Sequence, residues 1–266
     1  DNGGYSITGY SVTSSPSVSA PAGCTNTSNL SCTFTGLTNG TTYTFTVVAI
    51  NGVGTSSGAT ATGTPSTTPS QPTSLSAAAG DGQLTITFTA GSNGGSAITN
   101  YKYSPDGINY YAFVPAQTSS PITITGLTNG TSYTIYLKAM NNNGDGVASA
   151  SVTATPATTP GVPTSVSATS NANAQSVITW TAPTSNGGSS ITDYVIEYSS
   201  DSGSTWTTFN DGISTTASAT VTGLTNGTSY IFRVSAKNVI GTGSASTNST
   251  AAVPSTVTNA PTSVTG

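Results

Sequence analysis

The chain has 266 residues, of which 5% are charged and 34% are hydrophobic, and its formal net charge is −4. Its four basic residues are too few to neutralise a run of backbone phosphates, so the composition argues against nucleic-acid binding. No apolar stretch approaches the roughly 20 residues of a membrane helix, so no membrane span is expected.

The same short sequence motifs recur in the same order along the chain, which identifies tandem repeats. Three words recur at intervals of about 90–98 residues: Asn-Gly-Gly at Asn2, Asn93 and Asn186; Gly-Leu-Thr-Asn-Gly-Thr at Gly36, Gly126 and Gly223; and Pro-Thr-Ser at Pro72, Pro163 and Pro261. The chain is therefore an array of small units joined by segments rich in Pro, Thr and Ser.

The first unit contains the only two cysteines, Cys24 and Cys32. We expect the residues between them to form a hairpin tip that brings the cysteines opposite one another. A disulfide here closes a nine-residue loop and contributes about 2.6 kcal/mol in the chain-entropy model. It would place the chain in an oxidising, extracytoplasmic compartment. Asn26 and Asn29 lie on this tip within N-x-S/T patterns and are the candidate glycosylation sites.

Apolar residues alternate with polar ones in several segments, which predicts half-buried strands. The inward-facing sets are Tyr43, Phe45, Val47 and Ala49 in the first unit; Leu84, Ile86, Phe88, Tyr133, Ile135, Leu137 and Ala139 in the second; and Ile178, Trp180, Tyr230, Phe232, Val234 and Ala236 in the third. No segment has helical spacing. The predicted fold is all-β, with about seven short strands to a unit forming a β-sandwich.

Two segments between predicted strands have the composition of hairpin turns. The third unit has "SSDSGSTW" at Ser199–Trp206, which resembles the Asp box of sialidases, and the second unit has the related "SPDGINY" at Ser104–Tyr110. We expect Asp201 and Asp106 to accept backbone hydrogen bonds within these turns. A calcium or sugar site at the turn is the alternative.

The word "GLTNGT" followed by tyrosine, the prolines Pro72 and Pro163, and Trp180 together resemble the fibronectin type III family, in the version common in bacterial extracellular proteins. The resemblance spans essentially the whole chain and implies tandem immunoglobulin-like β-sandwiches. It implies that Trp180 occupies the tryptophan position of the second strand, with Phe88 replacing it in the second unit. It also implies three corner tyrosines: Tyr43, Tyr133 and Tyr230. The family's usual proline before the tyrosine is replaced by Asn-Gly, a tight-turn dipeptide.

These units define the expected domains. Residues 1–65 form a unit that lacks its first two strands, residues 66–156 and 157–254 form complete units, and residues 255–266 form a linker and the first strand of a further unit. The prolines in the junctions predict short, stiff connections, with the units arranged as beads on a rod.

The chain has few side chains of the types that act in catalysis or bind metals. The chain has no histidine, and most of its eight carboxylates lie in Gly- or Ser-flanked turns. Asp193 and Glu197 are close in sequence, but strand positions four apart are about 13 Å apart, and glycosidase chemistry needs two carboxylates across one cleft. We therefore expect no catalytic residues, no cofactor and no metal site.

The function favoured by these features is a non-catalytic extracellular or cell-surface structural protein, as a stalk, fibre or filament subunit. Its expected partners are other copies of itself or neighbouring domains of a longer chain, with cell-surface glycans or proteins as further candidates. One hypothesis is that the tail strand Pro261–Thr265 completes the first unit of a neighbouring copy by strand addition. The alternative function is an adhesin or an accessory carbohydrate- or protein-binding module of a larger secreted protein.

Overall fold

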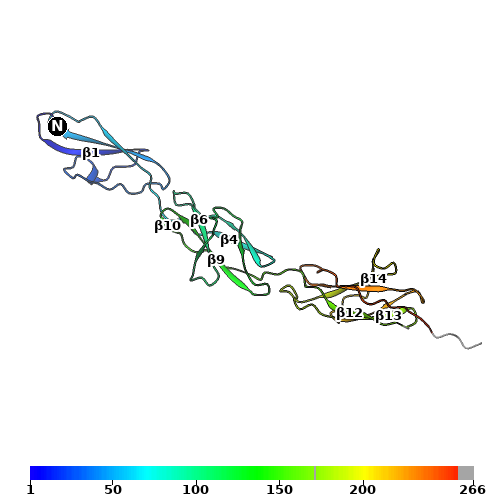
Figure 1. The fold of residues 1–266 in the computed structure, drawn as a ribbon. Coiled ribbons are helices and arrows are strands. Elements are labelled where there is room, and N and C mark those ends of the chain that lie inside the picture. The colour runs from blue at the N-terminus through cyan, green and yellow to red at the C-terminus, as the bar shows by residue number, and fades with distance from the viewer. Residues whose placement is uncertain (171, 257–266) are drawn as a thin grey trace, which may run out of the picture. The chain divides into compact units, whose positions relative to one another are not determined.

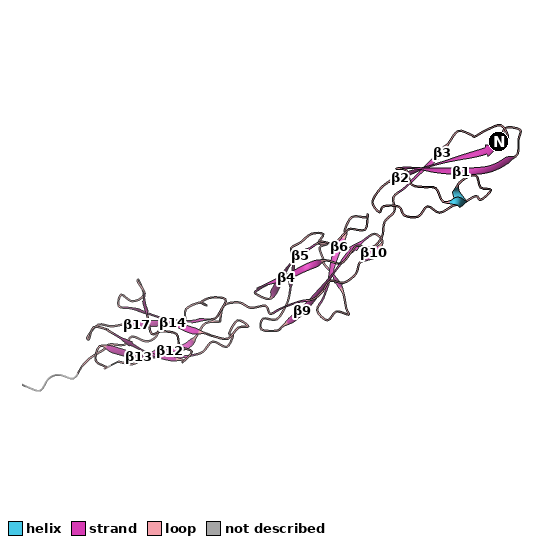
Figure 2. Ribbon diagram, turned by 180° about the vertical axis from the view of Figure 1, so that it is seen from behind, coloured by secondary structure: helices cyan, strands magenta, loops and turns pink. Residues whose placement is uncertain are grey.

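The computed structural model describes residues 1–170 and 172–256, and it confirms the all-β prediction. The only helix in this part of the chain is the single-turn 3₁₀ helix η1 (Ala22–Cys24), which is cyan in Figure 2. No helix among the described residues is long and apolar enough to cross a membrane. The predicted tail strand Pro261–Thr265 lies outside the described residues.

The first repeat contains one antiparallel sheet of three strands in the order β1-β2-β3 (Figure 1). Its strands are β1 (Ile7–Ser15), β2 (Tyr43–Asn51) and β3 (Ala59–Gly63). The segment between β1 and β2 contains the helix η1 and no strand.

The second repeat contains two sheets, with strand orders β4-β5-β8 and β10-β9-β6-β7, and β11 also pairs with β9. Its strands are β4 (Thr73–Gly80), β5 (Gln83–Thr89), β6 (Asn100–Ser104), β7 (Tyr111–Ala112), β8 (Ile122–Thr125), β9 (Tyr133–Asn141), β10 (Gly144–Asp145) and β11 (Val152–Ala154). Phe88 and Tyr101 meet edge to face with ring centroids 4.8 Å apart, so residues from both sheets share a core.

The third repeat has two three-stranded sheets, ordered β12-β13-β16 and β15-β14-β17. Its strands are β12 (Thr164–Ala168), β13 (Gln175–Thr181), β14 (Asp193–Ser199), β15 (Thr207–Phe209), β16 (Ser218–Thr222) and β17 (Ile231–Lys237). One buried cluster joins the two sheets, and it includes Ile178 and Trp180 of β13, Tyr194 of β14 and Phe232 of β17. This repeat is a β-sandwich whose inward-facing residues follow the predicted alternation.

The contacts of the described chain fall into two compact units, and their boundary passes through the second repeat. The first compact unit is formed by Asp1–Ser76, Ile86–Ile122 and Thr134–Val152. The second is formed by Ala77–Thr85, Thr123–Tyr133 and the chain from Thr153 onward.

The word "GLTNGT" is a turn that each repeat closes with a tyrosine hydroxyl. The backbone N–H of Thr38 donates to Tyr43 at 3.0 Å, that of Thr128 to Tyr133 at 3.0 Å and that of Thr225 to Tyr230 at 3.1 Å. Each tyrosine thus supplies an acceptor to a turn N–H that no strand pairs.

Removing this hydroxyl should weaken the corner. We expect Tyr230→Phe to lower the free energy of unfolding of the third repeat by about 1–2 kcal/mol, because the Thr225 N–H loses its partner. Amide hydrogen exchange in β17 measures this loss. Tyr111→Phe, at an exposed ring, is the control and should change nothing. Equal effects of the two substitutions would contradict a role for the corner hydroxyl.

Candidate functional site

The first repeat leaves open the sheet face that the other two repeats bury. Val47 is 39% exposed, whereas its counterparts Leu137 in β9 and Val234 in β17 are fully buried. Val47 lies on the predicted inward face of β2 but stays partly exposed, because within the described residues no second sheet covers β1 and β2.

A hollow of about 590 Å³ lies over this face. Apolar side chains form most of its floor and walls, among them Tyr10, Val12, Phe34, Leu37, Phe45 and Val47. Apolar patches exposed on a protein surface often mark interaction sites.

One rim of the hollow is the segment Ser31–Thr35, which belongs to no strand. By its position before Gly36-Leu37, this segment corresponds to β8 in the second repeat and to β16 in the third. There, Ile124 and Val221 are buried and their strands pair with β5 and β13. The first repeat therefore has both an uncovered apolar face and a strand-like segment beside it.

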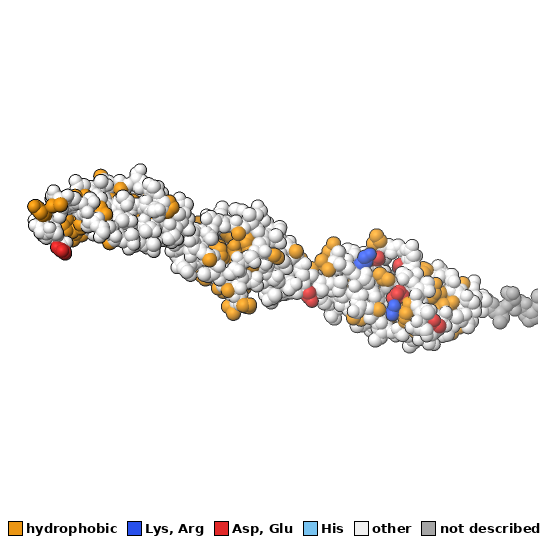
Figure 3. Space-filling view, turned by 90° about the horizontal axis from the view of Figure 1, so that it is seen from above, with side chains coloured by type: hydrophobic (Ala, Val, Ile, Leu, Met, Phe, Trp, Pro, Cys, Tyr) orange, Lys and Arg blue, Asp and Glu red, His pale blue; other side chains and the backbone are white. Residues whose placement is uncertain are grey.

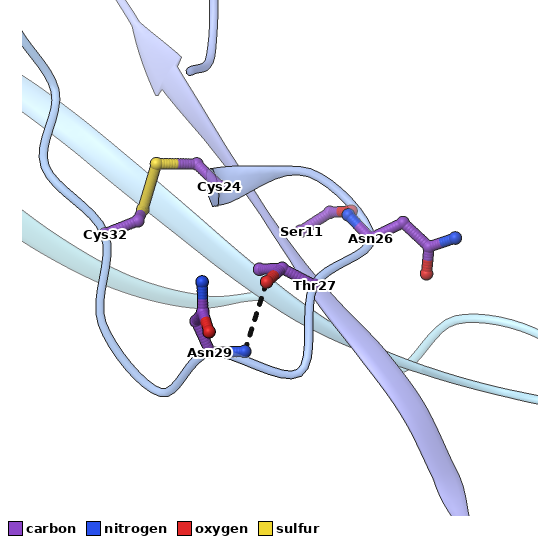
Figure 4. Close-up of a disulfide and its surroundings, with 6 residues drawn as sticks. All are labelled: Ser11, Cys24, Asn26, Thr27, Asn29 and Cys32. Carbon is purple, nitrogen blue, oxygen red and sulfur yellow. Dashed lines mark hydrogen bonds between the residues drawn. A yellow bond between two sulfur atoms is a disulfide. The ribbon is translucent and has the colours of Figure 1, made fainter. Parts of the chain in front are cut away.

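Cys24 and Cys32 form the predicted disulfide (Figure 4). Both cysteines line the hollow. The expected hairpin around it is wrong. Cys24 ends η1, and Thr27 exchanges two backbone hydrogen bonds with Tyr10 of β1, at 2.7 and 3.0 Å. The loop pairs with the edge strand β1 instead of with itself, so the disulfide fastens a loop that lies alongside β1.

Asn26 and Asn29 both lie exposed on this loop. The backbone N–H of Asn26 donates to the Ser11 hydroxyl at 2.9 Å, and that of Asn29 donates to the Thr27 hydroxyl at 3.1 Å. Figure 4 shows the Asn26 side chain directed away from the disulfide. Both side-chain amides remain available for modification, which stays a prediction.

The asparagine of "GLTNGT" has a structural task that sequence reasoning missed. Asn129 accepts the Gly82 N–H at 2.8 Å and donates to Asp81 at 2.7 Å. Asn226 likewise accepts the Ala174 N–H at 2.8 Å and donates to Asn173 at 2.8 Å. Each amide therefore links the corner to the turn between the first two strands of its repeat. The only sequence signal for this task was the return of asparagine at one position of each corner.

The turn carboxylates lie in hairpins, between β6 and β7 for Asp106 and between β14 and β15 for Asp201. Asp201 accepts from the Ser199 hydroxyl at 2.6 Å and from the hydroxyl and N–H of Thr205 at 2.7 and 2.9 Å. These hydrogen bonds lower the pKa of Asp201 to about 2. The N–H groups of Asn109 and Ile108, followed by side-chain donors, hold the pKa of Asp106 well below 3.8.

The remaining charged groups are few, as the face in Figure 3 shows, and several are paired with each other. Glu197 bonds Arg233 at 2.8 Å, and Lys102 bonds Asp145 at 2.8 Å. Across residues 1–170 and 172–256, no three metal-ligating side chains gather into a cluster.

Two aromatic faces near the hairpin turns are covered by cations. The Arg233 guanidinium lies 4.1 Å from the centre of the Trp206 ring, and the Lys138 ammonium lies 4.0 Å from the centre of the Tyr110 ring. A sugar that stacked on either covered face would have to displace a cation–π contact.

Comparison with known proteins agrees with this architecture. The family model described as the fibronectin type III domain matches residues 2–64, 70–155 and 161–252. Exoglucanase B of Cellulomonas fimi is 32% identical over 81% of the chain, and Endoglucanase B of the same organism is 40% identical over 50%. Chitinase A1 of Niallia circulans is 35% identical over 49% of the chain. The chain spans only 20%, 13% and 18% of these three relatives, respectively.

The low pKa of Asp201 yields a test of its turn. We expect the carboxyl carbon of Asp201 to titrate at about pH 2 in an NMR titration. Because the folded pKa lies below the ordinary value, the stabilisation is complete above about pH 4 and is lost as the pH falls through 2. Ser199→Ala should move the midpoint up toward 3.8, whereas Ser200→Ala, at an exposed neighbour, should not. A midpoint near 3.8 in the unaltered chain would contradict this account of the turn.

Proposed function

Because the chain belongs to the fibronectin type III family, we propose that its repeats serve as a non-catalytic extracellular structural array, as a stalk, fibre or filament subunit. The observation that carries the proposal is the open apolar face of the first repeat. In the other two repeats the same face is covered by a second sheet, so the kind of occupant that fits it is a β-strand.

The occupant we propose is the tail of a second copy, residues 257–266. Its sequence Pro-Thr-Ser-Val, at Pro261–Val264, resembles the sequences that begin at Pro72 and Pro163, where β4 and β12 start. Leu75 and Val166 in those strands are half-buried, and Val264 is their counterpart. In the other repeats β5 and β13 lie between β4 or β12 and β8 or β16. The tail would instead take the place that β5 and β13 hold, pairing its backbone with residues 31–34 and placing Val264 over the hollow.

The disulfide supports an oxidising, extracytoplasmic location for such an array. The low charge also suits it, because adjacent subunits with few charges repel one another little. Hydroxyl and amide side chains can then form the contacts at the boundaries between subunits.

The second candidate function is an accessory module of a secreted glycan-degrading enzyme. The observation that favours it is the set of relatives named exoglucanase, endoglucanase and chitinase, which the chain matches over a fifth of their length or less. The covered faces of Trp206 and Tyr110 argue that the module would act as a spacer there and not as a glycan-binding surface.

Strand addition predicts association that depends on the tail. We expect the sedimentation coefficient of the purified chain to rise with concentration, with linear or helical polymers visible by electron microscopy. Val264→Asp should weaken association at least about tenfold, because the added carboxylate would lose its hydration in an apolar hollow. Ser263→Asp is the matched control, since adjacent strand residues point to opposite faces. A chain that stays monomeric, or equal association of the two variants, would overturn strand addition.

The two candidate functions differ in glycan binding. In sedimentation assays with insoluble cellulose and chitin, we expect the chain to stay in the supernatant, because a sugar that stacked on the covered face of Trp206 or Tyr110 would have to displace a cation. Depletion of the chain by either polysaccharide would favour a carbohydrate-binding module over the structural array.

A further inference from the structure

The Asn-Gly turn of the corner contacts a second glycine turn in the repeat that follows. Within the first compact unit, Gly40 faces Gly95 of the Asn-Gly-Gly word in the second repeat. A Cβ added to Gly40 would lie 3.1 Å from the Cα of Gly95. A Cβ added to Gly95 would lie 2.7 Å from the carbonyl carbon of Asn39 and nearer still to the Gly40 nitrogen. No side chain fits on either residue without moving backbone.

The same contact recurs within the second compact unit, between Gly130 and Gly188. A Cβ on Gly130 would lie 3.2 Å from the Cα of Gly188, and a Cβ on Gly188 would lie 2.8 Å from the carbonyl carbon of Asn129. The two junctions, whose linkers share the sequence pattern Thr-Pro-x-Thr-Thr-Pro, thus reach the same geometry.

Hydrogen bonds fasten the linker to both turns at the first junction. The Gly40 N–H donates to the Pro65 carbonyl at 2.8 Å, and the Thr67 N–H donates to the Gly94 carbonyl at 2.8 Å. The Asn141 side chain then donates to the carbonyls of Thr67 and Asn93, at 2.7 and 2.8 Å.

The second junction repeats these bonds. The Gly130 N–H donates to the Pro156 carbonyl at 2.9 Å and the Thr158 N–H to the Gly187 carbonyl at 2.8 Å. Asn238 takes the place of Asn141, donating to the carbonyls of Thr158 and Asn186 at 2.8 and 2.9 Å.

We propose that the two glycine turns are a recognition surface between repeats: the corner of one repeat accepts a following repeat that carries an Asn-Gly-Gly turn. The corner at Gly227 presents the accepting half of this surface. Its N–H donates to the Pro254 carbonyl at 2.9 Å, its φ of +81° matches the +80° of Gly40, and nothing described lies within 4 Å of an added Cβ. The partner that fits it is a further fibronectin type III repeat with an Asn-Gly-Gly turn.

The chain contains matched controls for this proposal. Gly4 is the last glycine of an Asn-Gly-Gly motif, as Gly95 is, and its φ of +83° is close to the +85° of Gly95. However, no atom of the described residues lies within 4 Å of a Cβ added to Gly4. Gly→Ala at positive φ strains the backbone at both positions alike. Only at Gly95 does the new methyl group also meet another repeat.

Amide hydrogen exchange of Thr67 in the full chain tests the surface directly. We expect Gly95→Ala to accelerate this exchange at least about tenfold, because opening the contact frees the Thr67 N–H. Gly4→Ala should leave it unchanged, and Gly40→Ala should act like Gly95→Ala while Gly227→Ala does not. Exchange in β9 reports whether the second repeat is still folded. Unprotected Thr67 in the unaltered chain, or equal behaviour of Gly95→Ala and Gly4→Ala, would overturn the proposal.

The accepting half at Gly227 allows a test by addition. In a chain continued after Pro254 with a copy of residues 66–156, we expect the appended threonine equivalent to Thr67 to be as protected as Thr67 itself. Replacing both glycines of the appended Asn-Gly-Gly word by alanine should accelerate its exchange at least about tenfold. Equal exchange in the two extended chains would contradict recognition at this corner. This result is independent of self-association through the tail.

Discussion

The structure depends on a tight turn at the corner of each repeat, where the chain enters strand β2, β9 or β17. Such a turn leaves backbone N–H groups without strand partners, and burying them unpaired would be costly. The tyrosine hydroxyl accepts one of these groups, and a proline carbonyl of the following linker accepts another. In the second and third repeats the asparagine of the same turn also holds the turn between the first two strands. Through these hydrogen bonds, one six-residue motif is connected to a strand, a neighbouring turn and the linker.

The three repeats share this corner but differ in how they bury apolar surface. The third repeat closes one core between two sheets, with Phe232, Val234 and Ile196 fully buried. The first repeat has the same inward-facing pattern on β2, but Val47 remains exposed over a hollow. Its disulfide fastens the loop beside that hollow. The first repeat therefore differs from the other two repeats in having an apolar sheet face that no second sheet covers among the described residues.

Charge has a small and local part in this molecule. The ion pair Glu197–Arg233 joins the neighbouring strands β14 and β17, and Lys102–Asp145 joins β6 to β10 across β9. The two cation–π contacts each join a strand to a hairpin turn. The low pKa of Asp201 has the same origin as the turn itself, since the donors that stabilise the carboxylate also fix the loop. The carboxylate of Asp201 is thus bound within its own hairpin.

The sequence by itself determined the repeats, the all-β class, the fibronectin type III family and the cysteine pairing, because these depend on local patterns of period two and on words that return. It could not show that the cysteine loop pairs with β1, since that bonding depends on which strand lies beneath the loop. The alternating pattern alone could not distinguish Val47 from Leu137, although the comparison of repeats predicted that the first unit lacks its first two strands. Likewise, only the tertiary structure shows that Gly40 lies against Gly95. The close approach of two backbones depends on residues far apart in the chain. A glycine-containing motif alone does not show which other segment it contacts.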